Sequence, residues 1–347
     1  MDLFEAVRNY TDRKTFRNAL CLPETGILPL SPLAQGECNV NFLFSDPDGR
    51  QKYVFRVNLV SQMHLSDQIG YEYRALKSLL PSGRTPRPLY VDEAGLLPSD
   101  PGKYGVLVYE YLSGRPLDYR RDLKRAAEIF ADIHSVSAGT SGGELITPAD
   151  PLSAILDECE EMVQTYYQAP IAEEAVKIQI ARMLEKGRNI LASMPEYNGY
   201  RCIVNTEVNS GNFLMNDGGQ DYLIDWEKPV YGDPMQDLGH FLAPTTTFWK
   251  TDVILTAKEK EAFFASYLDA VRGQFDTLGA KERLNIYIPI TCLRGITWCA
   301  MAWVQYQDEA SGAPKNADTW KKLCAYLKPA FLDAIEKEYL DRKQEMV

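Results

Sequence analysis

The chain has 347 residues, enough for one large domain or two lobes, and its 45% apolar and 24% charged residues are typical of globular proteins. Its formal charge of −11 disfavours nucleic acid as a partner, because binding a phosphate backbone requires a basic surface. The negative charge would suit a cationic substrate, although solubility explains it equally well.

Strand signals dominate the first third of the chain. The first twenty residues predict an amphipathic helix, and residues 21–36, rich in proline and glycine, predict a loop. A hairpin follows, with strands at 41–44 and 52–59 joined by a Ser-Asp-Pro-Asp-Gly turn. Residues 66–80 predict a helix with one apolar face, and residues 105–112 predict a buried strand.

Helical patterns dominate the remainder, after a break at Ser113-Gly114. They cover residues 121–137, 151–167, 171–193, 257–277, 281–307 and 317–342. One β-rich island interrupts them at 200–226. We therefore predict an α+β protein in two parts, although this order of elements would fit many such proteins.

Polar side chains bracket the strands of the island. Glu207 and Asn212 follow its first strand, and Asp225 ends its last; they are separated by five and thirteen residues. A hairpin can bring all three to one point. Two carboxylates and an amide oxygen are ligands of the kind that Mg²⁺ takes alongside water and phosphate. The segment therefore predicts a divalent metal site.

Three motifs make this segment resemble the catalytic and metal loops of the aminoglycoside phosphotransferase and choline kinase superfamily. The family pattern is His-Gly-Asp-x-x-x-x-Asn, then Ile-Asp-[Trp/Phe]-Glu, then Gly-Asp-Pro-x-x-Asp-Leu. At matching spacing this chain has Asn-Thr-Glu at 205–207 with Asn212, Ile-Asp-Trp-Glu at 224–227 and Gly-Asp-Pro-Met-Gln-Asp-Leu at 232–238. The resemblance covers about residues 30–310.

The resemblance implies the α+β, protein-kinase-like two-lobed fold, with ATP between the lobes. The N-lobe would span residues 1–113 and carry an antiparallel sheet, and the mostly helical C-lobe would span 114–347. By resemblance, Glu207 stands at the catalytic aspartate, and Asn212 and Asp225 stand at the Mg²⁺ ligands. Asp237 matches an acid that we interpret as bracing the catalytic loop.

The N-terminal third agrees with this resemblance. Arg56 fits the strand base that holds the α- and β-phosphates, and Glu72 fits the helix acid that pairs with it. An arginine rather than a lysine there resembles the choline and ethanolamine kinase branch. Gly36 and Asn39 resemble that branch's phosphate-covering turn, and both are predicted to bind the nucleotide.

Further candidates concern adenine and the acceptor. Glu110 and Leu112 resemble the hinge whose backbone binds adenine. Glu227 follows the metal aspartate and could help a second metal or face the substrate; a surface salt bridge is the alternative. Trp298 and Trp303 could form an aromatic wall for a cationic amine. A core stripe at helical spacing is the alternative for the tryptophans.

The chain differs from the family pattern at the predicted site itself. Where the family has His, Gly and Asp, this chain has Asn205, Thr206 and Glu207. Glutamate is one methylene longer, and a misplacement of about 1 Å can cost on the order of a hundredfold in rate. Phosphoryl transfer nevertheless depends mostly on positioning and electrostatics. We predict an ATP- and Mg²⁺-dependent phosphotransferase acting on the hydroxyl of an amino alcohol, aminoglycoside or related metabolite. The alternative is a catalytically degenerate protein that binds a nucleotide or ligand without transfer.

Several other classes are disfavoured. No stretch reaches the roughly 18 uncharged apolar residues of a membrane helix. Seven cysteines without a Cys-x-x-Cys pair argue against disulfides and zinc. We expect a cytoplasmic protein with no membrane partner; the sequence leaves its oligomeric state open. His134 and His240 are interpreted as structural. A protein kinase is disfavoured because the Asp-Phe-Gly…Ala-Pro-Glu segment is absent.

Overall fold

The computed structural model describes residues 2–36, 38–61, 63–97, 103–137, 144–307 and 316–341, and the chain forms two compact units. The first unit comprises Met1–Pro116, Val136–Ile146 and Asn212–Val230, and the second comprises Leu117–Ser135, Thr147–Gly211 and Tyr231–Val347. The first change of unit lies close to the predicted boundary at residue 113. Later segments also alternate, so that Asn212 and Asp225 belong to the first unit and Glu207 to the second. The division into lobes at 1–113 and 114–347 stays a prediction.

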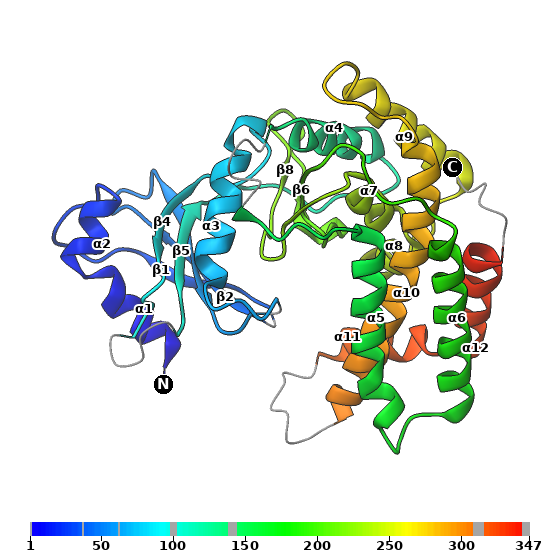
Figure 1. Cartoon of the computed structure of the whole chain (residues 1–347). Coiled ribbons are helices and arrows are strands. Elements are labelled where there is room, and N and C mark those ends of the chain that lie inside the picture. Colours follow the sequence, from blue (N-terminus) through cyan, green and yellow to red (C-terminus); the bar gives the residue numbers. More distant parts are fainter. Residues whose placement is uncertain are drawn as a thin grey trace. The chain divides into compact units, whose positions relative to one another are not determined.

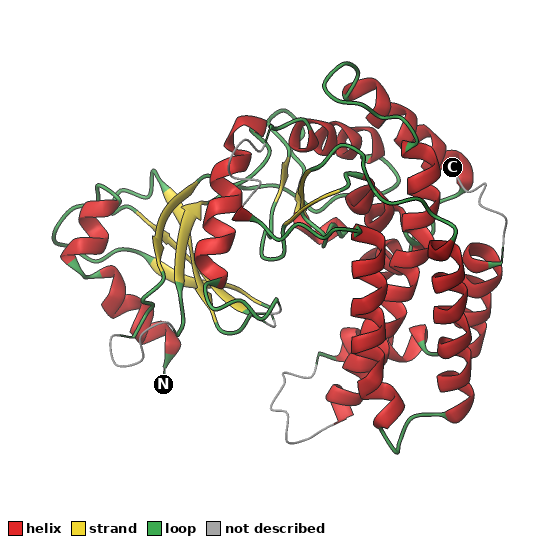
Figure 2. Cartoon of the chain, viewed as in Figure 1, coloured by secondary structure: helices red, strands yellow, loops and turns green. Residues whose placement is uncertain are grey.

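The first unit is built on a five-stranded antiparallel sheet of order β1-β2-β3-β5-β4 (Figure 2). Its strands are β1 (Leu30–Gln35), β2 (Asn39–Ser45), β3 (Lys52–Asn58), β4 (Pro88–Asp92) and β5 (Val106–Glu110). The aromatic and β-branched residues of β3 are buried, which suits the centre of a pleated sheet. The predicted hairpin is present as β2 and β3.

Helices cover both faces of this sheet (Figure 1). Helices α1 (Leu3–Thr11) and α2 (Lys14–Ala19) lie on one face, and α3 (Gln68–Leu79) lies on the other. Tyr10 and Phe16 pack with Phe44 and Phe55 of the sheet in one buried cluster. The sheet therefore lies between the α1–α2 pair and α3, and β3 is its central strand.

Two predictions for this region are wrong. The first twenty residues form two helices rather than one. The first helix ends at Thr11, where the Arg17 side chain binds the Thr11 carbonyl group and the Asp12 carboxylate. Residues 30–35, predicted as a loop, form strand β1. This strand is exposed and contains Pro32, which a sheet tolerates at an edge.

The second unit is mainly helical. Its helices are α4 (Leu123–His134), α5 (Pro151–Gln168), α6 (Glu174–Ala192), α7 (Met235–Leu242), α8 (Pro244–Thr251), α9 (Ala257–Ala270), α10 (Ala280–Gln307), α11 (Ala317–Tyr326) and α12 (Pro329–Ile335). Helices α5 and α6 run beside α10 (Figure 1). Within the described residues, no helix is long and apolar enough to cross a bilayer.

The helix predicted over 317–342 is divided. Pro329 begins a new helix, as its missing N–H group favours, and residues Glu336–Leu340 form a π-helical turn. Residue 342 lies outside the described residues. Helices α7 and α8 were not predicted, because their run of proline, threonine and glycine residues carries weak helical periodicity.

The β-rich island folds as short strands around two turns. The strands are β6 (Cys202–Val204), β7 (Phe213–Leu214) and β8 (Tyr222–Leu223), with a 3₁₀ turn at Ser210–Asn212; β9 (Val230–Gly232) lies beyond the predicted segment. Strands β7 and β8 pair antiparallel, with Phe213 opposite Leu223. The Ile224 N–H group donates to the Asn212 carbonyl oxygen at 2.8 Å. Asn212 and Asp225 therefore leave the same end of this hairpin.

Candidate functional site

A buried ion cluster in the first unit joins three elements. Arg56 of β3, whose residue surface is 4% exposed, donates from Nη1 to Glu72 Oε1 on α3 at 2.6 Å. Its Nη2 donates to Asp225 Oδ1 at 2.9 Å, and its Nε donates to the Asn41 side-chain oxygen at 3.1 Å. The predicted Arg56–Glu72 ion pair is therefore present, and the same guanidinium also holds Asp225.

The electrostatics of this cluster are set by burial. Burial raises the pKa of Glu72, Arg56 opposes the rise, and Asp225 adds to it. Burial alone would lower the pKa of Arg56, but the neighbouring acids, Glu72 foremost, raise it well above its usual value. Among the residues that the structure describes, Glu72 Oε2 is buried without a hydrogen-bond partner. The cluster thus keeps a charged guanidinium beside an Asp225 side chain that is 34% exposed.

Asp225 and Asn212 offer donors that fit a magnesium ion. Asp225 has a left-handed backbone, with φ +64°. It follows strand β8, and Asn212 directly precedes strand β7, so both residues lie at the same end of the β7–β8 hairpin. One carboxylate and one amide oxygen suit Mg²⁺, which takes few protein ligands and keeps water and phosphate oxygens. Among the described residues, no group of three or more His, Cys, Asp or Glu side chains could hold a metal. If Asn212 and Asp225 held such an ion, water and phosphate oxygens would be its other ligands.

The predicted phosphate-covering turn closes the β1–β2 hairpin. The Gly36 N–H group donates to the Asn39 carbonyl oxygen at 2.9 Å, and Glu37 lies outside the described residues. The buried Asn39 side chain donates to the Glu227 carboxylate. Gln68 of α3 donates to the Glu227 carbonyl oxygen at 2.6 Å. Glu227 is thus tied to both the sheet and α3, and its role toward a metal or substrate stays a prediction.

The predicted adenine hinge lies at the end of β5. The N–H groups of Glu110 and Tyr111 donate to carbonyl oxygens of neighbouring segments at 3.1 and 3.0 Å. Both are therefore used within the sheet. Leu112 comes next and is half-buried. Of the two predicted hinge residues, Leu112 is the one whose N–H group lies beyond the sheet.

In the second unit, Asp237 of α7 holds the loop that precedes Glu207. Its carboxylate accepts from the N–H groups of Asn205 and Thr206, each at 2.8 Å. This is the bracing contact that the sequence predicts for Asp237. His134 lies 3.3 Å from the same carboxylate and 2.9 Å from the Tyr267 hydroxyl oxygen, fully buried. A structural role for His134 follows.

The loop at 205–207 shows what two of the departures from the family pattern do to its backbone. The Asn205 side-chain oxygen accepts from the Glu207 N–H group at 3.0 Å and closes the turn. Thr206 has φ +70°, which costs a residue with a Cβ roughly 1–2 kcal/mol and is especially unfavourable for a β-branched one. Glycine, the family residue there, adopts this conformation without that cost. The loop is therefore strained at Thr206.

Sequence reasoning missed Arg294 of α10 and Glu158 of α5. Arg294 donates from Nε and Nη2 to the two Glu158 carboxylate oxygens, at 2.8 and 3.3 Å. Its Nη2 lies 3.7 Å from Glu207 Oε1, and its Nη1 donates to the Thr206 carbonyl oxygen at 3.5 Å. Burial would lower the pKa of Arg294, but Glu158 and then Glu207 raise it. No local pattern signals this contact, because its members lie on separate helices and a loop.

Trp298 and Trp303 belong to an aromatic cluster in the second unit. Trp298 meets Trp249 edge-on, with ring centroids 5.4 Å apart, and Trp303 stacks on Trp320 at 6.2 Å. Both side chains are half-buried. They pack as a core stripe would, and their contact with a substrate stays a prediction.

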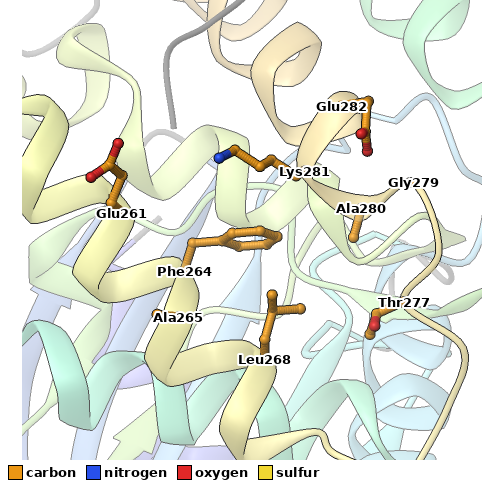
Figure 3. Close-up of a pocket in the computed structure, with 9 residues that line it drawn as sticks. All are labelled: Glu261, Phe264, Ala265, Leu268, Thr277, Gly279, Ala280, Lys281 and Glu282. Atoms are coloured by element: carbon orange, nitrogen blue, oxygen red, sulfur yellow. The ribbon is translucent and has the colours of Figure 1, made fainter.

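A separate pocket of about 320 Å³ lies between α9 and the start of α10 (Figure 3). Phe264 and Leu268 form its apolar side, and Glu261, Lys281 and Glu282 carry charges around it. None of the predicted site residues lines it. It therefore offers no support for the candidate site.

Comparison with known proteins places these features in a family. Residues 29–278 match the phosphotransferase enzyme family. A choline kinase from Cryptosporidium parvum has a TM-score of 0.68 at 11% identity, over 97% of this chain and 96% of that one. A spectinomycin phosphotransferase in complex with ADP and spectinomycin gives 0.62 at 14%, over 90% and 93%. An amicoumacin kinase in complex with AMP-PNP and Ca²⁺ gives 0.61 at 14%, over 97% of each.

These structural similarities confirm the α+β, protein-kinase-like fold. Because the sequence identities are so low, they show the fold alone. The family match spans well over half of the chain. It includes the Arg56 cluster, the 205–207 loop and the β7–β8 hairpin. As its motifs predict, the chain belongs to the phosphotransferase enzyme family.

Proposed function

We propose that the chain is an ATP-dependent small-molecule kinase, which transfers the γ-phosphoryl group of ATP to a hydroxyl group of its substrate. The cluster of Arg56, Glu72 and Asp225 carries this proposal. Kinases hold the α- and β-phosphates with a strand base oriented by a helix acid, and they hold the metal with a nearby aspartate. Here the strand, the helix and the aspartate meet through one guanidinium.

Each residue has a distinct part. Arg56 holds phosphate oxygens and Glu72 orients Arg56. Asn212 and Asp225 would hold Mg²⁺, which when bound neutralises charge on the phosphates. Glu207 orients or deprotonates the acceptor hydroxyl group. Because phosphoryl transfer makes a small demand on the base, a correctly placed glutamate can serve where the family has aspartate.

The acceptor is proposed to be an amino alcohol, an aminoglycoside or a related metabolite. Relatives of this fold are a choline kinase, a spectinomycin phosphotransferase and an amicoumacin kinase. The formal charge of −11 suits an aminated, cationic acceptor. A cytoplasmic location belongs to the same proposal and is supported by seven cysteines that are all free thiols.

Nucleotide binding is tested first, by thermal unfolding with ATP and Mg²⁺, separately and together. ATP and Mg²⁺ together should raise the unfolding temperature most, since a ligand at 100 times its Kd stabilises by about 2.7 kcal/mol. Asp225→Ala should abolish the magnesium-dependent part of the shift. Glu174→Ala, at an exposed carboxylate on α6, is the matched control and should keep it.

Transfer is tested next, with labelled ATP and a pool of metabolites, followed by mass identification of the product. The native chain should phosphorylate one class of aminated alcohol. Glu207→Ala should lose most of that turnover, leaving a measurable residual rate, while keeping the thermal shift with ATP. Binding without turnover, unaffected by Glu207→Ala, would favour the alternative of a degenerate nucleotide-binding protein.

A further inference from the structure

Both backbone polar groups of Thr206 are held by charged side chains. The Thr206 N–H group donates to Asp237 at 2.8 Å, and its carbonyl oxygen accepts from Arg294 at 3.5 Å. Thr206 has φ +70°, which is strained for a β-branched residue. Such strain persists only where the surroundings over-determine the conformation. Asp237 matches the family motif, whereas Arg294 belongs to no motif of the chain.

Arg294 is itself fixed by Glu158 on the neighbouring helix α5. Its Nε and Nη2 bind the two carboxylate oxygens at 2.8 and 3.3 Å, which is a bidentate pair. The guanidinium also faces the loop, toward the Thr206 carbonyl oxygen and Glu207 Oε1. Only 15% of the Arg294 side chain is exposed, so the bidentate pair sets its orientation.

The guanidinium suits this place for three reasons. It lies between the carboxylates of Glu158 and Glu207, which would otherwise repel each other. Its planar array of five donors can serve two carboxylates and a carbonyl group together, which a lysine ammonium group cannot match. Glu207 also has one more rotatable bond than the family aspartate, so its carboxylate needs a further contact to have a defined position.

We propose that Arg294, oriented by Glu158, is a positioning residue that holds Thr206 in its left-handed conformation and sets the position of the Glu207 carboxylate. The pair thereby allows a glutamate to occupy the place of the catalytic aspartate. The catalytic half of this proposal rests on the proposed function, whereas the effect on the loop is independent of it.

Amide hydrogen exchange of the full chain without ligand tests the loop, using peptides that cover residues 203–211. Arg294→Met should raise loop exchange about tenfold, because hydrogen bonds from a charged donor are lost. Glu158→Gln should raise it less. Arg188→Met is the matched control; Arg188 binds Glu160 at 2.5 Å between α6 and α5. It should leave loop exchange unchanged within about twofold.

The experiment has a second variant in case Arg294→Met does not fold. Arg294→Lys keeps the charge but not the bidentate geometry, and should raise loop exchange to an intermediate extent. Circular dichroism establishes that each variant is folded before exchange is measured. Unchanged loop exchange in folded Arg294→Met and Glu158→Gln overturns the proposal, whatever their activity.

The catalytic half is tested by kinetics with Mg²⁺, ATP and the acceptor found by the metabolite screen. Arg294→Met should lower kcat between about tenfold and a hundredfold, with KM for ATP changed less than about twofold. In a Glu207→Ala background the same change should cost nothing further. Faster exchange without loss of kcat would overturn this half. If the native chain transfers no phosphate while Arg294→Met still loosens the loop, the proposed function fails and the structural role stands.

Discussion

Replacing Arg56 with methionine tests whether the buried ion cluster is a structural as well as a catalytic unit. Glu72 is 2% exposed, its Oε1 accepts from Arg56 at 2.6 Å, and its Oε2 has no hydrogen-bond partner within the described parts of the chain. Without Arg56 a buried carboxylate remains without its cation, and Asp225 loses its 2.9 Å contact. Breaking a buried pair in this way costs about 3–5 kcal/mol. We expect Arg56→Met to lower the free energy of unfolding by that amount at about pH 8.

The loss should grow with pH. Burial raises the pKa of Glu72 and Arg56 opposes that rise, so removing Arg56 raises this pKa further. A carboxyl group whose pKa is higher in the folded state stabilises fully below its unfolded pKa and loses this contribution as pH rises through the folded pKa. The free energy of unfolding of the variant should therefore fall relative to the native chain, by at most about 1.4 kcal/mol per pH unit for one group.

Urea unfolding of both chains, followed by circular dichroism at about pH 5.5 and about pH 8, measures this. Arg87→Met is the matched control, because the Arg87–Glu110 pair is exposed and 3.8 Å long. It should change the free energy of unfolding by less than about 1 kcal/mol. A loss below about 1 kcal/mol in Arg56→Met at the higher pH, or a loss that shrinks as pH rises, would show that the buried ion cluster does not stabilise the fold in this way.

Three further predictions are measured by urea unfolding. Arg17→Met should lower the free energy of unfolding by about 1–3 kcal/mol, because it leaves three backbone carbonyl oxygens around α2 without their buried donor, while its ionic partner Asp12 is exposed; Arg8→Met, at an exposed pair, should lower it by less than about 0.5 kcal/mol. Gly239→Ala should cost about 1–3 kcal/mol, since its Cβ would lie 2.4 Å from a side-chain carbon of α10. Glu336→Gln should lower the free energy of unfolding by about 1–2 kcal/mol at neutral pH. Hydrogen bonds from Arg182 first, and then from Lys186, lower the pKa of Glu336 to about 2. The difference in stability between the variant and the native chain should therefore vanish as pH falls through that value.

Patterns that repeat along the chain predicted much of the fold. Apolar periodicity over 281–307 predicted helix α10, and β-branched residues over 52–59 predicted strand β3. Both signals are patterns within one segment, so they are visible without knowing what that segment packs against. The family resemblance predicted that Arg56 and Glu72 pair, because a strand base and a helix acid occupy fixed places in the kinase fold.

Other features depend on partners distant in sequence and have no local signal. Strand β4 begins with Pro88, which suggests a break until its pairing with β5 is known. The end of α1 depends on Arg17 capturing the Thr11 carbonyl group. The contact between Arg294 and Glu158 joins two helices that are far apart in the chain. Such contacts arise only from tertiary packing.

Asp225 in the first unit and Thr206 in the second both have left-handed backbones. Asp225 has a short polar side chain, which tolerates this conformation, and its carboxylate binds Arg56. Thr206 is β-branched, tolerates it less, and is held through its backbone by Asp237 and Arg294. Arg294 also contacts Glu207, so the threonine and the longer acid share one support. Glu207→Asp alone would therefore withdraw the carboxylate from Arg294 while leaving Thr206 strained. Relieving that strain also requires a glycine at position 206, which adopts the left-handed conformation without the cost.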